Sequence, residues 1–128
     1  MAGTDPRITA TASLQPYTEQ GWGGYDQAAQ DQQQGPMFMM SGTEDTIAPP
    51  EPNQQRVWDT TNAELFWGML EGANHLQDAM GNISRYRGPS TAWMRAHLMN
   101  DTKARAVFYD DCTLCDDPDW DVQYKERR

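Results

Sequence analysis

Two residues of this sequence could act together as an acid and base pair, the aspartate Asp45 and the histidine His75. Asp45 comes shortly after the apolar run PMFMM and the turn SGTE, and His75 follows ELFWGML and the turn EGAN. A histidine can take a proton from a nucleophilic hydroxyl, and a carboxylate can hold the ring in the right tautomer and stabilise the imidazolium. These two residue types therefore predict the acid and base of a Ser-His-Asp triad.

Each residue taken alone has a simpler explanation. An aspartate after a glycine turn often shapes the turn or caps the next helix, and the prolines beyond Asp45 indicate a helix start. A histidine after a strand is often an ordinary surface or core residue. The catalytic interpretation is favoured because both residues follow the ends of successive predicted strands, where open α/β sheets place their catalytic groups.

The elements that must position this pair alternate between strands and helices. Strands are predicted over 8–14, 36–40 and 64–70, helices over 53–60 and 84–99, and helical turns near 26–30 and 101–109. The longer helix is expected to begin at Pro89, and its Trp93 to face the sheet. The continuous apolar run PMFMM suits a strand covered on both faces of a mostly parallel sheet. The fold class is therefore α/β, with about three parallel strands and flanking helices.

Composition argues against several classes of partner. The 128 residues have a formal charge of −9, so the surface repels nucleic acid and anionic lipid headgroups. No apolar run is long enough to span a membrane, and no charged segment followed by an apolar one opens the chain as an export signal would. The residues from 110 to 128 read as an acidic, irregular tail following one domain portion over 1–109.

The two blocks GPMFMMSGTEDTIAPP and ELFWGMLEGANHLQ resemble the late strands of cutinase-like polyester (PET) hydrolases, in the dienelactone-hydrolase branch of the α/β-hydrolases. In that family a Gly-x-x-Asp-Thr-Ile/Val-Ala-Pro turn holds the catalytic acid and Gly-Ala-x-His holds the base. The resemblance, which runs from about residue 5 to 112, implies these roles for Asp45 and His75. It also implies the C-terminal part of an α/β-hydrolase fold.

The resemblance implies a carboxylic-ester hydrolase that needs no metal or organic cofactor and is secreted or periplasmic. Polyester, lipid and small esters all stay open as substrates. Tyr17 and Ile47 match residues that flank the ester-binding cleft, and an aromatic ring and a branched alkyl group suit an apolar ester. They could equally be ordinary core or rim residues.

The chain departs from the family in two respects. The nucleophile motif Gly-x-Ser-x-Gly is absent from these residues, so we expect the nucleophile half upstream, as a missing partner, and no activity from this chain alone. Relatives pair a cysteine at the position of Cys112 with one many residues later, whereas here Cys115 is the only other cysteine. A Cys112–Cys115 disulfide is possible, and a redox or metal role for this C-x-x-C is a weaker alternative.

A noncatalytic module is the alternative function. An α/β domain that binds a partner or ligand could retain the late-strand pattern by ancestry. The coding sequence immediately upstream distinguishes the two, because the enzyme requires an in-frame Gly-x-Ser-x-Gly there.

Overall fold

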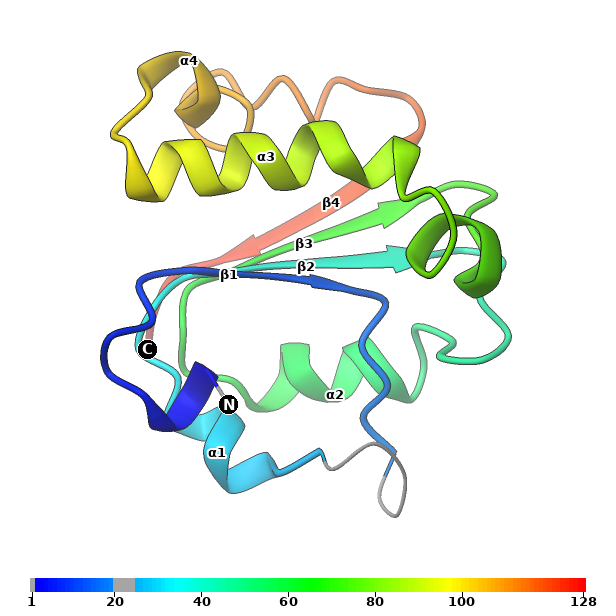
Figure 1. Ribbon diagram of the computed structural model, residues 1–128, viewed down its shortest axis with the longest axis horizontal. Helices are drawn as coiled ribbons and strands as arrows, with labels where there is room; N and C mark the ends of the chain where they lie inside the picture. The colour runs from blue at the N-terminus through cyan, green and yellow to red at the C-terminus, as the bar shows by residue number, and fades with distance from the viewer. Residues whose placement is uncertain (1, 20–24) are drawn as a thin grey trace.

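The computed structural model describes residues 2–19 and 25–128 as a sheet with helices on both faces (Figure 1). Strands β1 (Thr11–Leu14), β2 (Met37–Gly42) and β3 (Leu65–Leu70) are parallel, and β4 (Trp120–Lys125) runs antiparallel to β3. The order across the sheet is β1-β2-β3-β4. The expected α/β class and its three parallel strands are confirmed.

The helices divide between the two faces of the sheet (Figure 1). Helices α3 (Ser84–Leu98) and α4 (Thr102–Arg105) lie on one side, and α1 (Gln27–Asp31) and α2 (Asn53–Thr60) on the other. Short helical turns cover Ala2–Thr4 and His75–Ala79. Within the residues that the structure describes, no helix combines the length and apolarity needed to cross a membrane.

The prediction that the longest helix begins at Pro89 is wrong. Helix α3 begins at Ser84, and Pro89 lies inside it. The turn before the proline is fixed by tertiary contacts: Tyr86 is fully buried and its hydroxyl donates to the backbone oxygen of Ser41 at 3.1 Å. Such contacts override the local preference of a proline for the first helical position.

The prediction that residues 110–128 are irregular is also wrong. Trp120–Lys125 pairs along the whole of β3, with Trp120 opposite Leu70 and Tyr124 opposite Phe66. The segment WDVQYK alternates apolar and polar residues, which is the pattern of a strand with one covered face. The high density of aspartate around it hid this signal.

Strand β2 is covered on both faces, as its apolar composition predicts, and every residue in it is buried. Phe38 and Met40 join the core under α3, and Met37 and Met39 join the core under α2. Alternate side chains of a strand point to opposite faces, so one strand supplies both cores. This double burial holds the end of β2, and the turn that follows it, in a fixed place.

Trp93 is the central side chain of the core beneath α3. It is fully buried, as predicted, and its ring centroid lies 4.9 Å from that of Phe108, 5.7 Å from Phe38 and 6.2 Å from Phe66. Aromatic rings at these separations add to the free energy gained from burial. The position of α3 over the sheet therefore depends strongly on this residue.

His97 lies one turn beyond Trp93 and makes the stability of the fold sensitive to acid. Its ring centroid is 4.2 Å from that of Trp93, its Nε2 is 3.2 Å from the Tyr109 hydroxyl, and burial lowers the pKa of His97 from the ordinary 6.5. The unfolded chain then binds the proton more readily than the folded one. The resulting stability is present above pH 6.5 and is lost as the pH falls through the lower folded-state pKa.

We therefore expect His97→Gln to flatten the dependence of the free energy of unfolding on pH. Urea titrations of both proteins at about pH 7.5 and about pH 5.5 measure the difference. The wild type should lose more stability on acidification than the variant. An equal or larger loss in the variant would contradict a neutral, half-buried His97.

Candidate functional site

The turns that follow β2 and β3 lie side by side, since parallel neighbouring strands end at the same edge of the sheet. Three hydrogen bonds join them: Thr43 N–H donates to Leu70 O at 3.1 Å, Glu44 N–H to Ala73 O at 3.0 Å, and Gly72 N–H to Thr43 Oγ1 at 2.8 Å. Gly42 permits this approach, because a Cβ there would stand 2.3 Å from Ala73 O. The two turns form one rigid platform.

Asp45 lies on this platform with its side chain completely buried. One carboxylate oxygen, Oδ1, accepts the backbone N–H groups of Ile47 at 2.9 Å and Ala48 at 2.8 Å. The other oxygen, Oδ2, lies 2.8 Å from Nδ1 of His75. Asp45 is thus both a turn former and the partner of His75, with one oxygen for each role.

His75 opens the helical turn His75–Ala79, and its side chain is 15% exposed. The expected hydrogen bond to Asp45 is present. An ionised carboxylate can only accept, so it selects the tautomer with the proton on Nδ1 and leaves the lone pair of Nε2 free. A buried carboxylate on one ring nitrogen and an unprotonated second nitrogen make an imidazole that can accept a proton and keep its orientation.

The hydroxyls of Ser41 and Ser90 are engaged away from His75. Ser41 Oγ is buried, accepting from Trp67 Nε1 at 2.7 Å and donating to Gln54 Oε1 at 3.0 Å. Ser90 donates to the backbone oxygen of Tyr86. Among the hydrogen bonds of the described residues, none joins a serine hydroxyl to His75.

The two expected substrate-binding residues lie in different places. Ile47 is 45% exposed and adjoins Asp45 through its backbone. Tyr17 lines a hollow of about 320 Å³ beside β1, whose lining includes neither Asp45 nor His75. The structure therefore places Ile47 directly beside the acid, whereas Tyr17 lines a hollow at the β1 side of the sheet.

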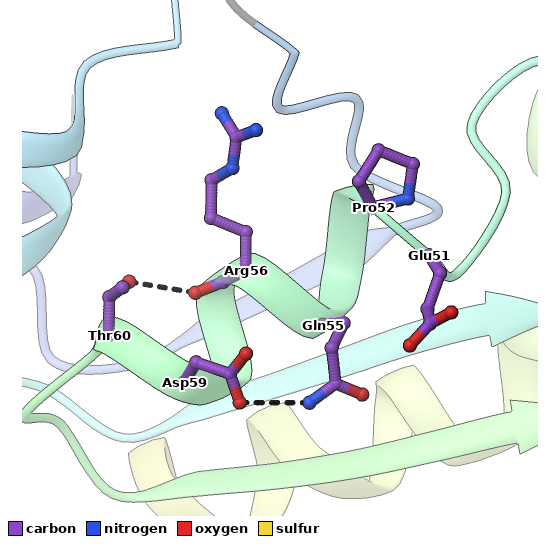
Figure 2. Close-up of a pocket in the computed structure, with 6 residues that line it drawn as sticks. All are labelled: Glu51, Pro52, Gln55, Arg56, Asp59 and Thr60. Carbon is purple, nitrogen blue, oxygen red and sulfur yellow. Dashed lines mark hydrogen bonds between the residues drawn. The ribbon is translucent and has the colours of Figure 1, made fainter.

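A second hollow, of about 380 Å³, lies along α2 and is shown in Figure 2. Within the helix, Gln55 donates to Asp59 at 2.9 Å and Thr60 donates to the backbone oxygen of Arg56 at 2.8 Å. Arg56 also donates to the backbone oxygen of Thr18 at 3.0 Å. Neither residue of the acid and base pair lines it. Its lining side chains are exposed or half-buried, so the hollow offers no fully buried group for chemistry.

The cysteines are joined to each other, because Cys112 and Cys115 form a disulfide. The bridge closes a loop of very few residues, so its contribution through chain entropy is small. Over residues 2–19 and 25–128, no three His, Cys, Asp or Glu side chains gather as they would around a metal ion.

Sequence reasoning missed two residues that hold the turn carrying His75, namely Asp78 and Arg85. Asp78 Oδ2 accepts the backbone N–H of Asn74 at 2.9 Å, and Asp78 Oδ1 accepts from the guanidinium of Arg85. An available signal was the spacing of Asn74 and Asp78, since a polar cap followed within a turn by an acid is typical of a helix start.

Comparison with known proteins adds no identification. The chain matches no protein-family model, and a search of curated proteins finds no significant match to it. Any functional assignment therefore depends on the geometry described above and on the resemblance of the two turn motifs.

Proposed function

We propose that this chain supplies the acid and base of a serine esterase similar to the cutinase-like polyester hydrolases. The observation that carries the proposal is the 2.8 Å contact between buried Asp45 Oδ2 and His75 Nδ1, at the carboxyl ends of adjacent parallel strands. This is the arrangement that a triad requires of its orienting acid and its general base. The turn motifs GTEDTIAP and GANH agree with it.

In the proposed mechanism Nε2 of His75 takes the proton of a serine hydroxyl as the serine oxygen attacks an ester carbonyl. His75 then gives this proton to the departing alcohol, which leaves an acyl-enzyme. The same nitrogen activates the water that hydrolyses the acyl-enzyme, and Asp45 stabilises the imidazolium in both steps. No metal or organic cofactor is needed for this sequence of steps.

The serine and the oxyanion donors would come from an upstream half, meaning the segment encoded in frame before residue 1. The outer edge of β1 supports such a partner. Strand β1 lies at the end of the sheet, with β2 on its other side. The edge of a sheet is a template for pairing with a further strand, which the upstream half would provide.

The proposed substrate is an ester with an apolar acyl or aromatic part, whether a polyester, a lipid or a small ester. Ile47, exposed beside Asp45, would contact it, and Tyr17 would flank the cleft from the β1 side. The disulfide suits an oxidising compartment, so we propose that the enzyme is secreted or periplasmic.

We expect Asp45→Asn to lower kcat for ester hydrolysis by about 10⁴-fold in the chain joined to its upstream half, because an amide donor selects the wrong tautomer of His75. Initial rates on a p-nitrophenyl ester measure this. Asp101→Asn is the matched control, since Asp101 also accepts two backbone N–H groups, at the start of α4, away from the site. Equal rates in both variants would contradict the proposal.

A further inference from the structure

The backbone next to His75 is hydrogen-bonded to the buried carboxylate of Asp78. Asp78 lies within the helical turn that His75 opens, and its side chain is only 11% exposed. Its Oδ2 accepts the N–H of Asn74, the residue immediately before His75, while its own N–H donates to Asn74 O at 3.1 Å. This reciprocal pair fixes the backbone at the position from which the imidazole projects.

Arg85, in the first turn of α3, completes the arrangement. Its Nε and one terminal nitrogen donate to Asp78 Oδ1 at 3.2 and 3.1 Å. Its other terminal nitrogen donates to the backbone oxygen of Glu71 at 2.9 Å. The Arg85 guanidinium therefore links Asp78 to Glu71, the first residue of the turn that follows β3. Only arginine offers the planar set of donors that makes these bonds together.

Asp78 and Arg85 both form hydrogen bonds to the backbone of the turn between β3 and His75. Between Glu71 and Asn74 lies Ala73, whose backbone oxygen accepts the N–H of Glu44 in the turn of Asp45. Charge-assisted bonds in a partly buried setting are stronger than neutral ones at the surface. A rotation of the His75 turn away from Asp45 would have to break several of them together.

We propose that Asp78 and Arg85 are positioning residues for His75, which keep its Nδ1 directed at Asp45. The inference rests on the proposed function, since an oriented imidazole matters only if His75 is a base. Neither side chain touches the reacting atoms. Their effect passes through the backbone of Asn74 and Glu71, so that the 2.8 Å contact between His75 and Asp45 depends on α3 as well as on the sheet.

The test is the tautomer of His75, read from its imidazole ¹⁵N shifts in the 128-residue chain, and it requires no activity. In the wild type the Nδ1–H form should dominate. Arg85→Gln should raise the Nε2–H population about tenfold or more, because misplacement of an oriented group by an ångström is enough to lose its function. Arg85→Lys keeps the charge but loses the planar guanidinium, so its Nε2–H population should lie between those of the wild type and Arg85→Gln.

Arg95→Gln is the matched control, since Arg95 is on the same helix and also pairs with an aspartate, Asp101, at 2.6 Å. Arg85 is 41% exposed in its side chain, so Arg85→Gln disturbs the core less than Asp78→Asn would. Circular dichroism before the measurement verifies that each variant is folded. Asp78→Asn, where it folds, should reproduce the result of Arg85→Gln.

Equal tautomer populations in Arg85→Gln and Arg95→Gln would overturn the inference, as would a wild type already dominated by the Nε2–H form. A different pair of results is expected if the positioning role is right but the protein is not an esterase. In that case the tautomer would still respond to Arg85→Gln, while the chain joined to its upstream half would hydrolyse no ester.

Discussion

Residues 1–128 alone are expected to leave a short p-nitrophenyl ester unhydrolysed above the background rate, and activity should appear when the upstream half is added. An imidazole and a carboxylate without a nucleophile or oxyanion donors give water only weak general-base help. In a complete triad enzyme the nucleophile and its base together supply about 10⁶-fold in kcat. The expected change on reconstitution is correspondingly large.

The reconstituted activity has a matched control in the two histidines of the chain. His75→Ala should abolish it, whereas His97→Ala should leave kcat near the wild-type value, because His97 lies in the last turn of α3 against Trp93 and Tyr109. Substantial hydrolysis by residues 1–128 alone that disappears in His75→Ala would contradict the account. One of the chain's own serines would then be the nucleophile.

Trp93→Ala is expected to lower the free energy of unfolding by about 3 to 5 kcal/mol, since it removes a fully buried indole from a closed aromatic cluster. The rings of Phe38, Phe66 and Phe108 around it belong to the sheet and to the segment after α4, so the cavity cannot close by moving one element. Urea denaturation of the reconstituted protein measures the loss.

Trp58→Ala is the control for this loss. Trp58 is only partly buried and packs against Trp67 and Lys125 at the other face of the sheet. Trp58→Ala should lower the free energy of unfolding clearly less than Trp93→Ala does. A loss below about 1 kcal/mol for Trp93→Ala would mean that α3 does not pack on the sheet in this way.

The parts of the fold that sequence reasoning predicts are those with a local cause. PMFMM is apolar throughout because both of its faces are covered, and Gly42 follows because the backbone of Ala73 approaches it. Asp45 and His75 lie in the turns that follow the strand ends, and their positions follow from the parallel order of β2 and β3. Their contact follows from the parallel arrangement of the two strands, which the sequence pattern predicts.

The parts that were missed have causes distant in the sequence. Strand β4 forms because Trp120 and Val122 complete the core under α3, although aspartates surround them. The start of α3 precedes Pro89 because Tyr86 is bonded to Ser41, on another element. In the site, the guanidinium of Arg85 reaches Glu71 from the next helix, and no local pattern predicts that bond.

Labelling with an alkyl fluorophosphonate, followed by peptide mass spectrometry, tests the central claim most directly. The reagent phosphonylates a serine that a neighbouring base activates: the serine oxygen bonds to phosphorus and fluoride leaves. With the chain joined to its upstream half, we predict one adduct, on a serine upstream of residue 1, that is lost in His75→Ala and kept in His97→Ala. An adduct on Ser13, Ser41, Ser84 or Ser90, or labelling that persists without His75, would contradict the assignment of Asp45 and His75 as the acid and base of an esterase.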